Sequence, residues 1–339
     1  MSEGVGGMIP VFPVYRSVEE IPHGFGPSVG AIGNFDGVHC GHRKILEAVA
    51  AEARGSGMRA VAITFDPHPD RFLRPAEAPK LLTPMAERVK LLAGTGIDAV
   101  VILPFDEALA GLAAWEFARR ILVEALGIRS VHEGRNFRFG RHAEAGVKEL
   151  KKLGAEFGFG LHLHEAARTH GMEVSSSATR VLVAQGDVRR ARWMLGRPFA
   201  VRSTPARGRG IGTRLLVPTV NLAPYAELLP GFGVYVTRLT VGGRRFKAVT
   251  NVGNRPTFGE ASFAVESYIL DFEPIDLHPA DKDLSAGTTA KLDEETPVEL
   301  EFLYRLRGEM TWPSPEALKA QIFRDVARAK RYFRLDASF

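Results

Sequence analysis

The sequence has a single cysteine, Cys40, so no disulfide can form within the chain. It also lacks any apolar run approaching the roughly 18 consecutive residues that suggest a transmembrane helix. Residues 1–17 contain no basic region followed by an apolar stretch, and they are therefore unlike a secretory signal. Together these absences predict a cytoplasmic protein with no membrane partner.

The chain also lacks a strong excess of either charge. Its 44 Lys and Arg against 39 Asp and Glu give a formal net charge of +5, which suits anionic partners such as nucleotides or phosphorylated cofactors. Basic residues are spread along the chain among acidic ones, so we expect small-molecule substrates and no nucleic-acid partner. The sequence leaves self-association open.

At 339 residues with 45% hydrophobic content, the chain is long enough for two domains with sizeable cores. In the first half, apolar runs alternate with amphipathic segments. Strands are expected at 28–35, 58–66, 98–105, 128–134 and 159–166, and helices at 42–57, 83–96, 113–127 and 144–158, with Thr83 as an N-cap. This order predicts a parallel, doubly wound α/β sheet.

The second half has a different pattern. Short alternating segments at 233–241, 244–253, 263–272 and 297–306, separated by turn signals, predict an antiparallel barrel or sandwich. A closing helix is expected at 314–333 with Ser314 as its N-cap. We therefore place the domains at 1–195 and 196–339, and we expect a long flexible loop at 274–296.

The segment 33–42, GNFDGVHCGH, lies where the first expected strand gives way to a helix. His39 and His42 are three residues apart and would share one helical face, beside an N-terminus that favours phosphate. Two imidazoles and backbone N–H groups can stabilise charge on a phosphoryl group during in-line displacement. The segment thus predicts an ATP-handling nucleotidyl-transfer site; the alternatives are metal binding, which needs further ligands, or ordinary surface histidines.

A second segment, VSSSATR (174–180), places hydroxyl groups at an expected helix start, followed by Arg180. Hydroxyls, helix amides and a guanidinium suit a triphosphate. The alternative is a serine N-cap followed by a solvated arginine.

Five segments, taken in order and spacing, resemble one family. They are GNFDGVHCGH, TFDPHP (64–69), LLTPMAER (81–88), GRNFRFG (134–140) and VSSSATR. They resemble the adenylyltransferase module of the prokaryotic bifunctional riboflavin kinase/FMN adenylyltransferase (FAD synthetase) family. The chain's His132 and Glu133 depart from that family, in which these positions tend to be apolar.

The resemblance implies that His39 and His42 are catalytic and stabilise the ATP phosphates. The implied ATP-binding set comprises Gly33, Asn34, Phe35, Asp36, Ser176, Ser177 and Arg180, of which the last three would grip the departing pyrophosphate. The implied flavin or nucleotide pocket comprises His68, Asn136, Phe137 and Arg138. Asp36 can orient the loop, act through Mg²⁺ or cap a turn, and Phe137 can stack on a flavin or belong to the core.

The C-terminal half contains a second set of candidates. A glycine-rich stretch at 206–214 can wrap phosphates, and Thr219 and Asn221 alternate onto one face of a strand, where their oxygens can ligate Mg²⁺. Glu266 lies among apolar neighbours and is either a solvent-facing residue or a general base.

These features, with NVGNRPTFG (251–259) and VESYILDF (265–272), resemble the riboflavin kinase module, a six-stranded barrel. The resemblance implies that Gly208, Gly210, Pro218, Thr219 and Asn221 bind MgATP, and that Glu266 takes the proton from the ribityl 5′-hydroxyl. Residues 213–217 depart from the family's usual loop. The expected function is ATP- and Mg²⁺-dependent conversion of riboflavin to FMN and of FMN to FAD. The alternatives are one activity alone, a different acceptor, or a non-catalytic flavin- or RNA-binding regulator.

Overall fold

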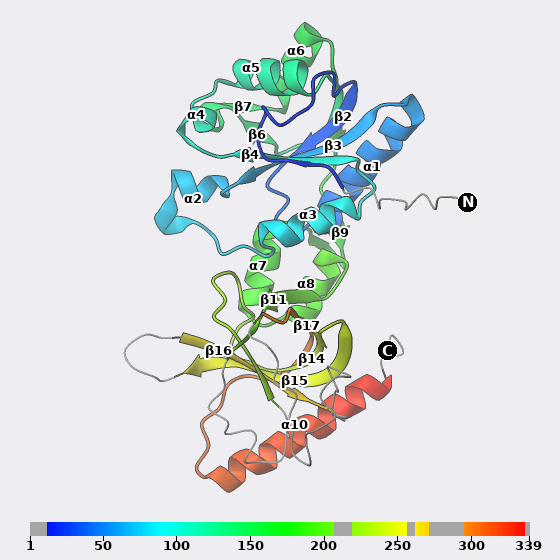
Figure 1. The fold of residues 1–339 in the computed structure, drawn as a ribbon. Coiled ribbons are helices and arrows are strands. Elements are labelled where there is room, and N and C mark those ends of the chain that lie inside the picture. The colour runs from blue at the N-terminus through cyan, green and yellow to red at the C-terminus, as the bar shows by residue number, and fades with distance from the viewer. Residues whose placement is uncertain (1–11, 207–218, 256–261, 271–294, 336–339) are drawn as a thin grey trace, which may run out of the picture. The chain divides into compact units, whose positions relative to one another are not determined.

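A computed structural model describes residues 12–206, 219–255, 262–270 and 295–335 (Figure 1). The chain divides into two compact units, Met1–Ser176 and Ser177–Phe339. The domain boundary at 195/196 stays a prediction. The loop expected at 274–296 lies almost wholly outside the described residues.

The N-terminal unit is built on a six-stranded sheet in which every neighbouring pair is parallel. Its order is β1 (Val14–Tyr15), β4 (Ala99–Pro104), β3 (Arg59–Asp66), β2 (Ser28–Ile32), β5 (Ile128–Gly134) and β8 (Gly160–His164). The prediction of a parallel α/β sheet is confirmed. The sequence did not indicate β1, because two residues are too few to show a period.

Helices cover both faces of this sheet (Figure 1). Helices α1 (Cys40–Ser56) and α3 (Met85–Ala93) pack on one face, while α5 (Ala114–Phe117), its π-helical continuation η2 (Ala118–Ala125) and α6 (Val147–Phe157) pack on the other. Alternate residues of β3 divide between the two cores: Val61 and Ile63 join the α5–α6 side, and Ala60 and Ala62 the α1–α3 side. Both faces of the strand are therefore apolar, as a doubly covered sheet requires.

Short elements connect these layers. They are α2 (Pro69–Leu73), η1 (Pro75–Glu77), α4 (Glu107–Ala110), η3 (Arg141–Ala143), the hairpin of β6 (Arg138–Phe139) with β7 (Ala145–Gly146), and the hairpin of β9 (Arg168–Thr169) with β10 (Met172–Glu173). The expectation that Thr83 caps α3 is wrong. The N-cap of α3 is Pro84, because the amide and hydroxyl of Thr83 are bound to Asp36 instead.

The C-terminal unit holds most of α7 (Ser176–Ala184), then α8 (Val188–Leu195) and a seven-stranded antiparallel sheet. Its order is β11 (Phe199–Ser203), β17 (Val298–Arg307), β14 (Gly233–Val241), β15 (Arg244–Arg255), β16 (Ser262–Ile269), β13 (Thr219–Leu222) and β12 (Pro205–Ala206). The two edge strands, β11 and β12, are consecutive in the chain and separated by Thr204 alone. The sheet must therefore curl on itself, which confirms the predicted barrel-like class with one short strand beyond the six implied.

Helix α10 (Pro315–Leu335) closes the C-terminal unit, and Ser314 Oγ accepts the Ala317 N–H at 3.3 Å, as expected of an N-cap. Ala329 and Phe333 of α10 pack against the sheet. At the edge of this contact, Arg307 Nε donates to Asp325 Oδ2 at 2.8 Å, and the Asp325 side chain is only 3% exposed. Gln321 donates to the other carboxylate oxygen. An ion pair thus joins β17 to α10.

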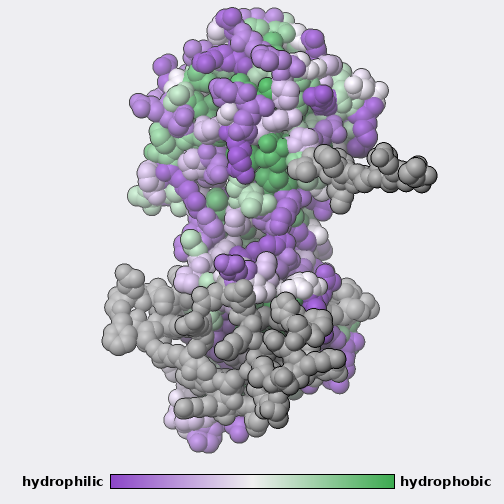
Figure 2. Space-filling view, in the orientation of Figure 1, coloured by the Kyte–Doolittle hydropathy of each residue, from purple (hydrophilic) through white to green (hydrophobic). Residues whose placement is uncertain are grey.

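Hydrophilic side chains cover much of the N-terminal unit on the face in Figure 2, and hydrophobic ones emerge in smaller areas between them. In the described part of the chain, no helix combines the length and the hydrophobicity needed to cross a bilayer. The cytoplasmic location stays a prediction, and self-association stays open.

Replacement of Asp325 by alanine should lower the free energy of unfolding of the C-terminal unit by about 3–5 kcal/mol, because it leaves Arg307 without its buried carboxylate. Thermal denaturation measures this. The matched control is Glu124→Ala, which breaks the exposed pair with Arg119 and should cost at most about 1 kcal/mol. Equal losses of unfolding free energy in the two variants would show that the buried ion pair stabilises the protein no more than the exposed one.

Candidate active sites

The loop between β2 and α1 has an unusual backbone. Phe35, Gly37 and Val38 have φ angles of 45°, 83° and 37°, a left-handed region that a β-branched residue such as Val38 rarely adopts. Phe35 and Val38 are also almost fully buried. Strain of this kind persists only where surrounding contacts enforce it, and it concentrates at ligand-binding sites.

The Asp36 carboxylate supplies those contacts. Its oxygens accept the N–H groups of Leu82 and Thr83, each at 2.9 Å, and the Thr83 hydroxyl at 3.2 Å. Arg88 Nη2 lies 3.8 Å from Asp36 Oδ1, and both side chains are 1% exposed. The Thr83 hydroxyl also accepts the Gly37 N–H at 3.0 Å. Of the alternatives for Asp36, these contacts favour the loop-orienting one.

His39 is the N-cap of α1, which begins at Cys40, two residues before the expected start at 42. Its Nδ1 accepts the His42 N–H at 3.2 Å, which leaves the proton of the neutral ring on Nε2. The two imidazole rings stack with centroids 3.6 Å apart. Gly41 makes room for this stack, since a Cβ there would lie 3.2 Å from the His39 ring.

His42 lies between the His39 ring and the edge-on ring of Phe35, whose centroid is 5.2 Å away. Burial, and then the neighbouring His39 and Arg88, holds the pKa of His42 well below its usual range. Its Nδ1 is buried and has no hydrogen-bond partner among the described residues. The ring is therefore neutral at pH 7 and retains an unused nitrogen.

Ser176 and His68, two further expected residues, contact this loop. The Ser176 hydroxyl donates to the Asp36 carbonyl at 2.9 Å, and so the start of α7 is tied to the loop. Asn34 Nδ2 lies 3.1 Å from His68 Nε2, and His68 caps α2 through Nδ1. His68 thus belongs with Asn34 at the ends of β2 and β3. Ser177 and Arg180 lie further along α7.

Glu133 is a residue of this site that the sequence marked only as an unusual polar position. Its Oε1 accepts the Ile32 N–H at 2.6 Å, where β2 ends and the loop begins. The side chain is buried, and burial raises the pKa of its carboxyl well above the usual value. Glu133 therefore ties the carboxyl end of β5 to that of β2.

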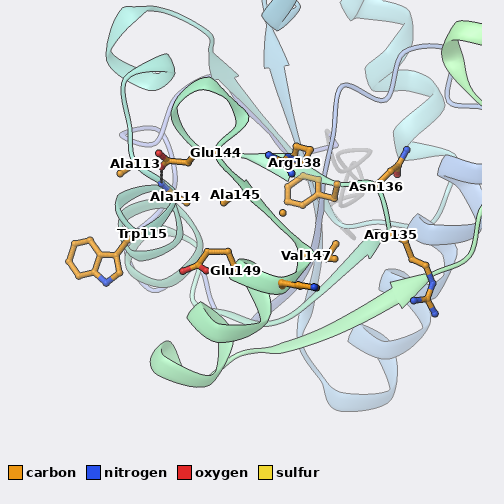
Figure 3. Close-up of a pocket in the computed structure, with 13 residues that line it drawn as sticks. Ala113, Ala114, Trp115, Arg135, Asn136, Arg138, Glu144, Ala145, Val147 and Glu149 are labelled. Atoms are coloured by element: carbon orange, nitrogen blue, oxygen red, sulfur yellow. Dashed lines mark hydrogen bonds between the residues drawn. The ribbon is translucent and has the colours of Figure 1, made fainter.

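A cleft of about 720 Å³ lies between α5, the β6–β7 hairpin and the start of α6 (Figure 3). Asn136, Phe137 and Arg138 line it, as the resemblance implied for a flavin or nucleotide pocket, but His68 does not. The lining also includes residues that the sequence did not indicate: Ala113, Ala114, Trp115, Arg135 and the run 144–149. A cleft of this volume matches the usual size of small-molecule sites.

Contacts across this cleft hold its walls in place. Glu144 Oε1 accepts the Ala114 N–H at 2.9 Å, and Arg138 donates to the Ala143 carbonyl at 3.0 and 2.6 Å. Phe137 stacks on Phe139 with ring centroids 5.4 Å apart. Phe139 is buried in the core, whereas Phe137 packs against that core and also lines the cleft.

In the C-terminal unit, strand register brings three predicted residues onto one face. Asn221 of β13 pairs with Glu266 of β16, and Thr219, two residues before Asn221, pairs with Tyr268. Asn251 of β15 pairs with Glu266 from the other side. Opposed residues in antiparallel strands point to the same face, so Thr219, Asn221 and Glu266 share one surface. Glu266 is half-buried there, which leaves both the solvent-facing and the general-base alternatives open.

The remaining kinase candidates, Gly208, Gly210 and Pro218, lie outside the described residues, as does the altered stretch 213–217. The sequence did carry a signal for the two anchors of the first loop, because Thr83 and Arg88 both fall within LLTPMAER. It contained no comparable signal for the cleft lining from α5 and α6.

Comparison with known proteins covers both units. A family model for FAD synthetase matches residues 23–178, and one for riboflavin kinase matches residues 195–333. The bifunctional riboflavin kinase/FMN adenylyltransferase of Pseudomonas fluorescens is 33% identical over 303 residues, which cover 89% of this chain and 92% of its own. The enzyme of that name from Escherichia coli K12 is 31% identical over 305 residues, with coverages of 90% and 92%.

A crystal structure described as a macrolide-efflux protein from Streptococcus pneumoniae has a TM-score of 0.81 at 23% identity, over 94% of this chain and 99% of that one. This likeness shows a shared fold alone. Because both family models match and the curated relatives align over nearly the whole chain, the protein belongs to the bifunctional riboflavin kinase/FMN adenylyltransferase family.

Proposed function

We propose a division of labour for the two reactions of this family. The protein phosphorylates riboflavin to FMN and adenylylates FMN to FAD. The loop 33–42 of the N-terminal unit binds ATP for the second reaction, and the β6–β7 cleft takes FMN. The observation that carries this assignment is the stacked His39–His42 pair, held at the N-terminus of α1 by a strained, buried loop.

In adenylyl transfer, a phosphate oxygen of FMN attacks the α-phosphorus of ATP, and the bond to the bridging oxygen of pyrophosphate breaks. Charge spreads over the phosphoryl oxygens, so catalysis depends on positioning and electrostatics. His39 presents its Nε2–H as a donor. A bound polyphosphate offsets the burial cost that keeps His42 neutral, so His42 takes up a proton as ATP binds and then stabilises the developing charge.

Pyrophosphate leaves toward the start of α7 in this scheme. Ser176 is already bound to the loop through the Asp36 carbonyl, and a helix N-terminus favours anions. Ser177 and Arg180 follow on the same helix and add a hydroxyl and a guanidinium. Their role rests on the resemblance alone.

In the kinase reaction, Glu266 removes the proton from the ribityl 5′-hydroxyl as that oxygen attacks the γ-phosphorus of ATP, and ADP leaves. Thr219 and Asn221 face the same surface as Glu266 and carry the hard oxygen donors that Mg²⁺ prefers. These residues fit a magnesium site, and the ion, when bound, neutralises phosphate charge. Asn251 flanks Glu266 and helps to orient the hydroxyl.

Replacement of His42 by alanine should reduce FAD formation about 100- to 1,000-fold, because it removes a charge-stabilising group from the transition state. FMN should accumulate, since the kinase residues are untouched. Chromatography of flavins after incubation with riboflavin, ATP and Mg²⁺ measures both products. The exposed His23→Ala variant serves as control and should behave as the parent protein. Loss of FMN in the His42 variant would contradict separate sites.

The Glu266→Gln variant should show the converse pattern. Loss of a general base slows riboflavin phosphorylation about 100- to 10,000-fold, while added FMN is still converted to FAD. Glu299→Gln, a strand carboxylate paired with Arg202, is the matched control. Unchanged FMN formation in Glu266→Gln would contradict a general-base role and would indicate that Glu266 is a solvent-facing residue.

Asp36→Ala separates loop orientation from metal binding. We expect the free energy of unfolding of the N-terminal unit to fall by about 3–5 kcal/mol even without ATP and Mg²⁺, because Arg88 loses its buried carboxylate. FAD formation should fall with it. Asp106→Ala, which removes the N-cap of α4, should cost only about 1 kcal/mol. Full stability of Asp36→Ala with loss of activity would instead favour a direct role at Mg²⁺.

A further inference from the structure

Three histidines and a glutamate gather on the α1-covered side of the N-terminal sheet, away from the elements that line the FMN cleft. They are Glu52 of α1, His132 of β5, and His162 and His164 of the edge strand β8, and we call them the β8 histidine cluster. His132 pairs in register with His162, and His164 follows two residues later. The leucines at 161 and 163 alternate with these histidines, so the imidazoles share one face of β8.

The donor atoms of this cluster converge. His132 Nε2 lies 2.7 Å from Glu52 Oε2, and His162 Nε2 lies 3.4 Å from the same oxygen. One donor atom from each of these three residues lies within 4.8 Å of the other two. In a tetrahedral zinc site with bonds near 2.1 Å, neighbouring donor atoms are about 3.4 Å apart. The cluster therefore needs only a small opening of the His132–Glu52 contact to surround an ion.

A fourth residue supports this geometry. His164 Nε2 lies 3.0 Å from His132 Nδ1, on the opposite side of the His132 ring from Glu52. When Nε2 of His132 binds a metal, its Nδ1 carries the proton and donates it to His164. Metal-binding histidines are usually oriented by such a hydrogen bond from their second nitrogen. His164 is thus a positioning residue, and the ligands are Glu52, His132 and His162.

From this arrangement we infer that the β8 histidine cluster is a binding site for a divalent transition-metal ion of the zinc class. Imidazole nitrogens favour Zn²⁺ over Mg²⁺, which prefers oxygen donors, so this ion is distinct from the magnesium bound with ATP. His132 is buried, whereas the His162 side chain is 56% exposed, which gives the ion a path from solvent and leaves a coordination position open to it. The positive charge of Lys44 in α1 interacts electrostatically with His164, and it would repel a cation bound nearby.

The ion would join elements that carry the adenylyltransferase loop. Helix α1 begins at the His39 cap, and Glu133, next to His132, binds the Ile32 N–H. Because Glu52, His132 and His162 would all bind the same ion, the ion would link α1 to β5 and β8. Because the ion binds the folded state, it should raise the midpoint of thermal unfolding by an amount that grows with the logarithm of its concentration above the dissociation constant. This inference does not depend on the proposed roles of His39 and His42.

The test is a titration of the tag-free, chelator-treated full chain with Zn²⁺ in competition with a chromophoric chelator. Thermal unfolding and the visible absorption of added Co²⁺ are measured in parallel. We expect about one high-affinity equivalent that excess Mg²⁺ does not displace. His162→Ala and Glu52→Gln should weaken binding at least about 100-fold, and His164→Ala about 10- to 100-fold.

Two control variants locate the site. His142→Ala removes an exposed histidine elsewhere on the N-terminal unit, and His42→Ala tests the other histidine pair; both should keep parental Zn²⁺ affinity. His162 is half-exposed on an edge strand, so its loss should not prevent folding, which far-ultraviolet circular dichroism checks. Zn²⁺ binding that is absent in the parent, or equal in parent and His162→Ala, would overturn the inference. Loss of binding in His42→Ala alone would place the ion at the nucleotide loop instead and would also overturn it.

Discussion

The buried carboxylate of Asp36 makes the contacts on which the proposed adenylyltransferase site depends. It joins a loop that follows β2 to the segment before α3, 46 and 47 residues away, through the N–H groups of Leu82 and Thr83. Arg88 balances its charge inside the protein. These contacts offset the cost of holding Phe35 and Val38 at positive φ, and they place the start of α1 where His39 and His42 stack.

The same loop is held from its other sides by neighbouring strands. Glu133 binds the last amide of β2, and the Thr64 hydroxyl donates to the Asn34 carbonyl at 3.3 Å. The site thus sits at the carboxyl ends of adjacent parallel strands, where an open α/β sheet leaves room for a ligand. In the proposed reaction this rigidity has a chemical purpose, because donors aimed at phosphate in advance need no reorganisation during transfer.

In the C-terminal unit, strand register brings the candidate kinase residues together, as the Asp36 contacts do for the loop of the N-terminal unit. Asn221, Glu266 and Asn251 meet because β13, β16 and β15 are neighbours in a sheet that curls until its edges adjoin. On the opposite face, the buried hydroxyls of Thr237, Thr250 and Ser267 form a ladder at 2.7 and 2.8 Å, which satisfies polar groups inside the unit. The α10 helix then covers part of the Glu266 face through Val249 and Tyr268.

Local patterns in the sequence were enough for much of this. The alternation of strands and helices, the change to antiparallel strands, and the Ser314 cap all follow from short-range periodicity and capping chemistry. The H-x-G-H pair was located from its place between a strand and a helix. The cap at Thr83 was predicted wrongly, because a side chain that can cap can equally bind a distant partner.

By itself the sequence determined most of the elements, their order, and the donors proposed for the two sites, because these depend on residues a few positions apart. Tertiary structure alone decided which donors meet: Asp36 with Thr83, Glu133 with Ile32, and His132 with His162. Such pairs depend on strand order, register and helix packing. A difference of one residue in register would turn His162 to the other face of β8 and separate it from Glu52.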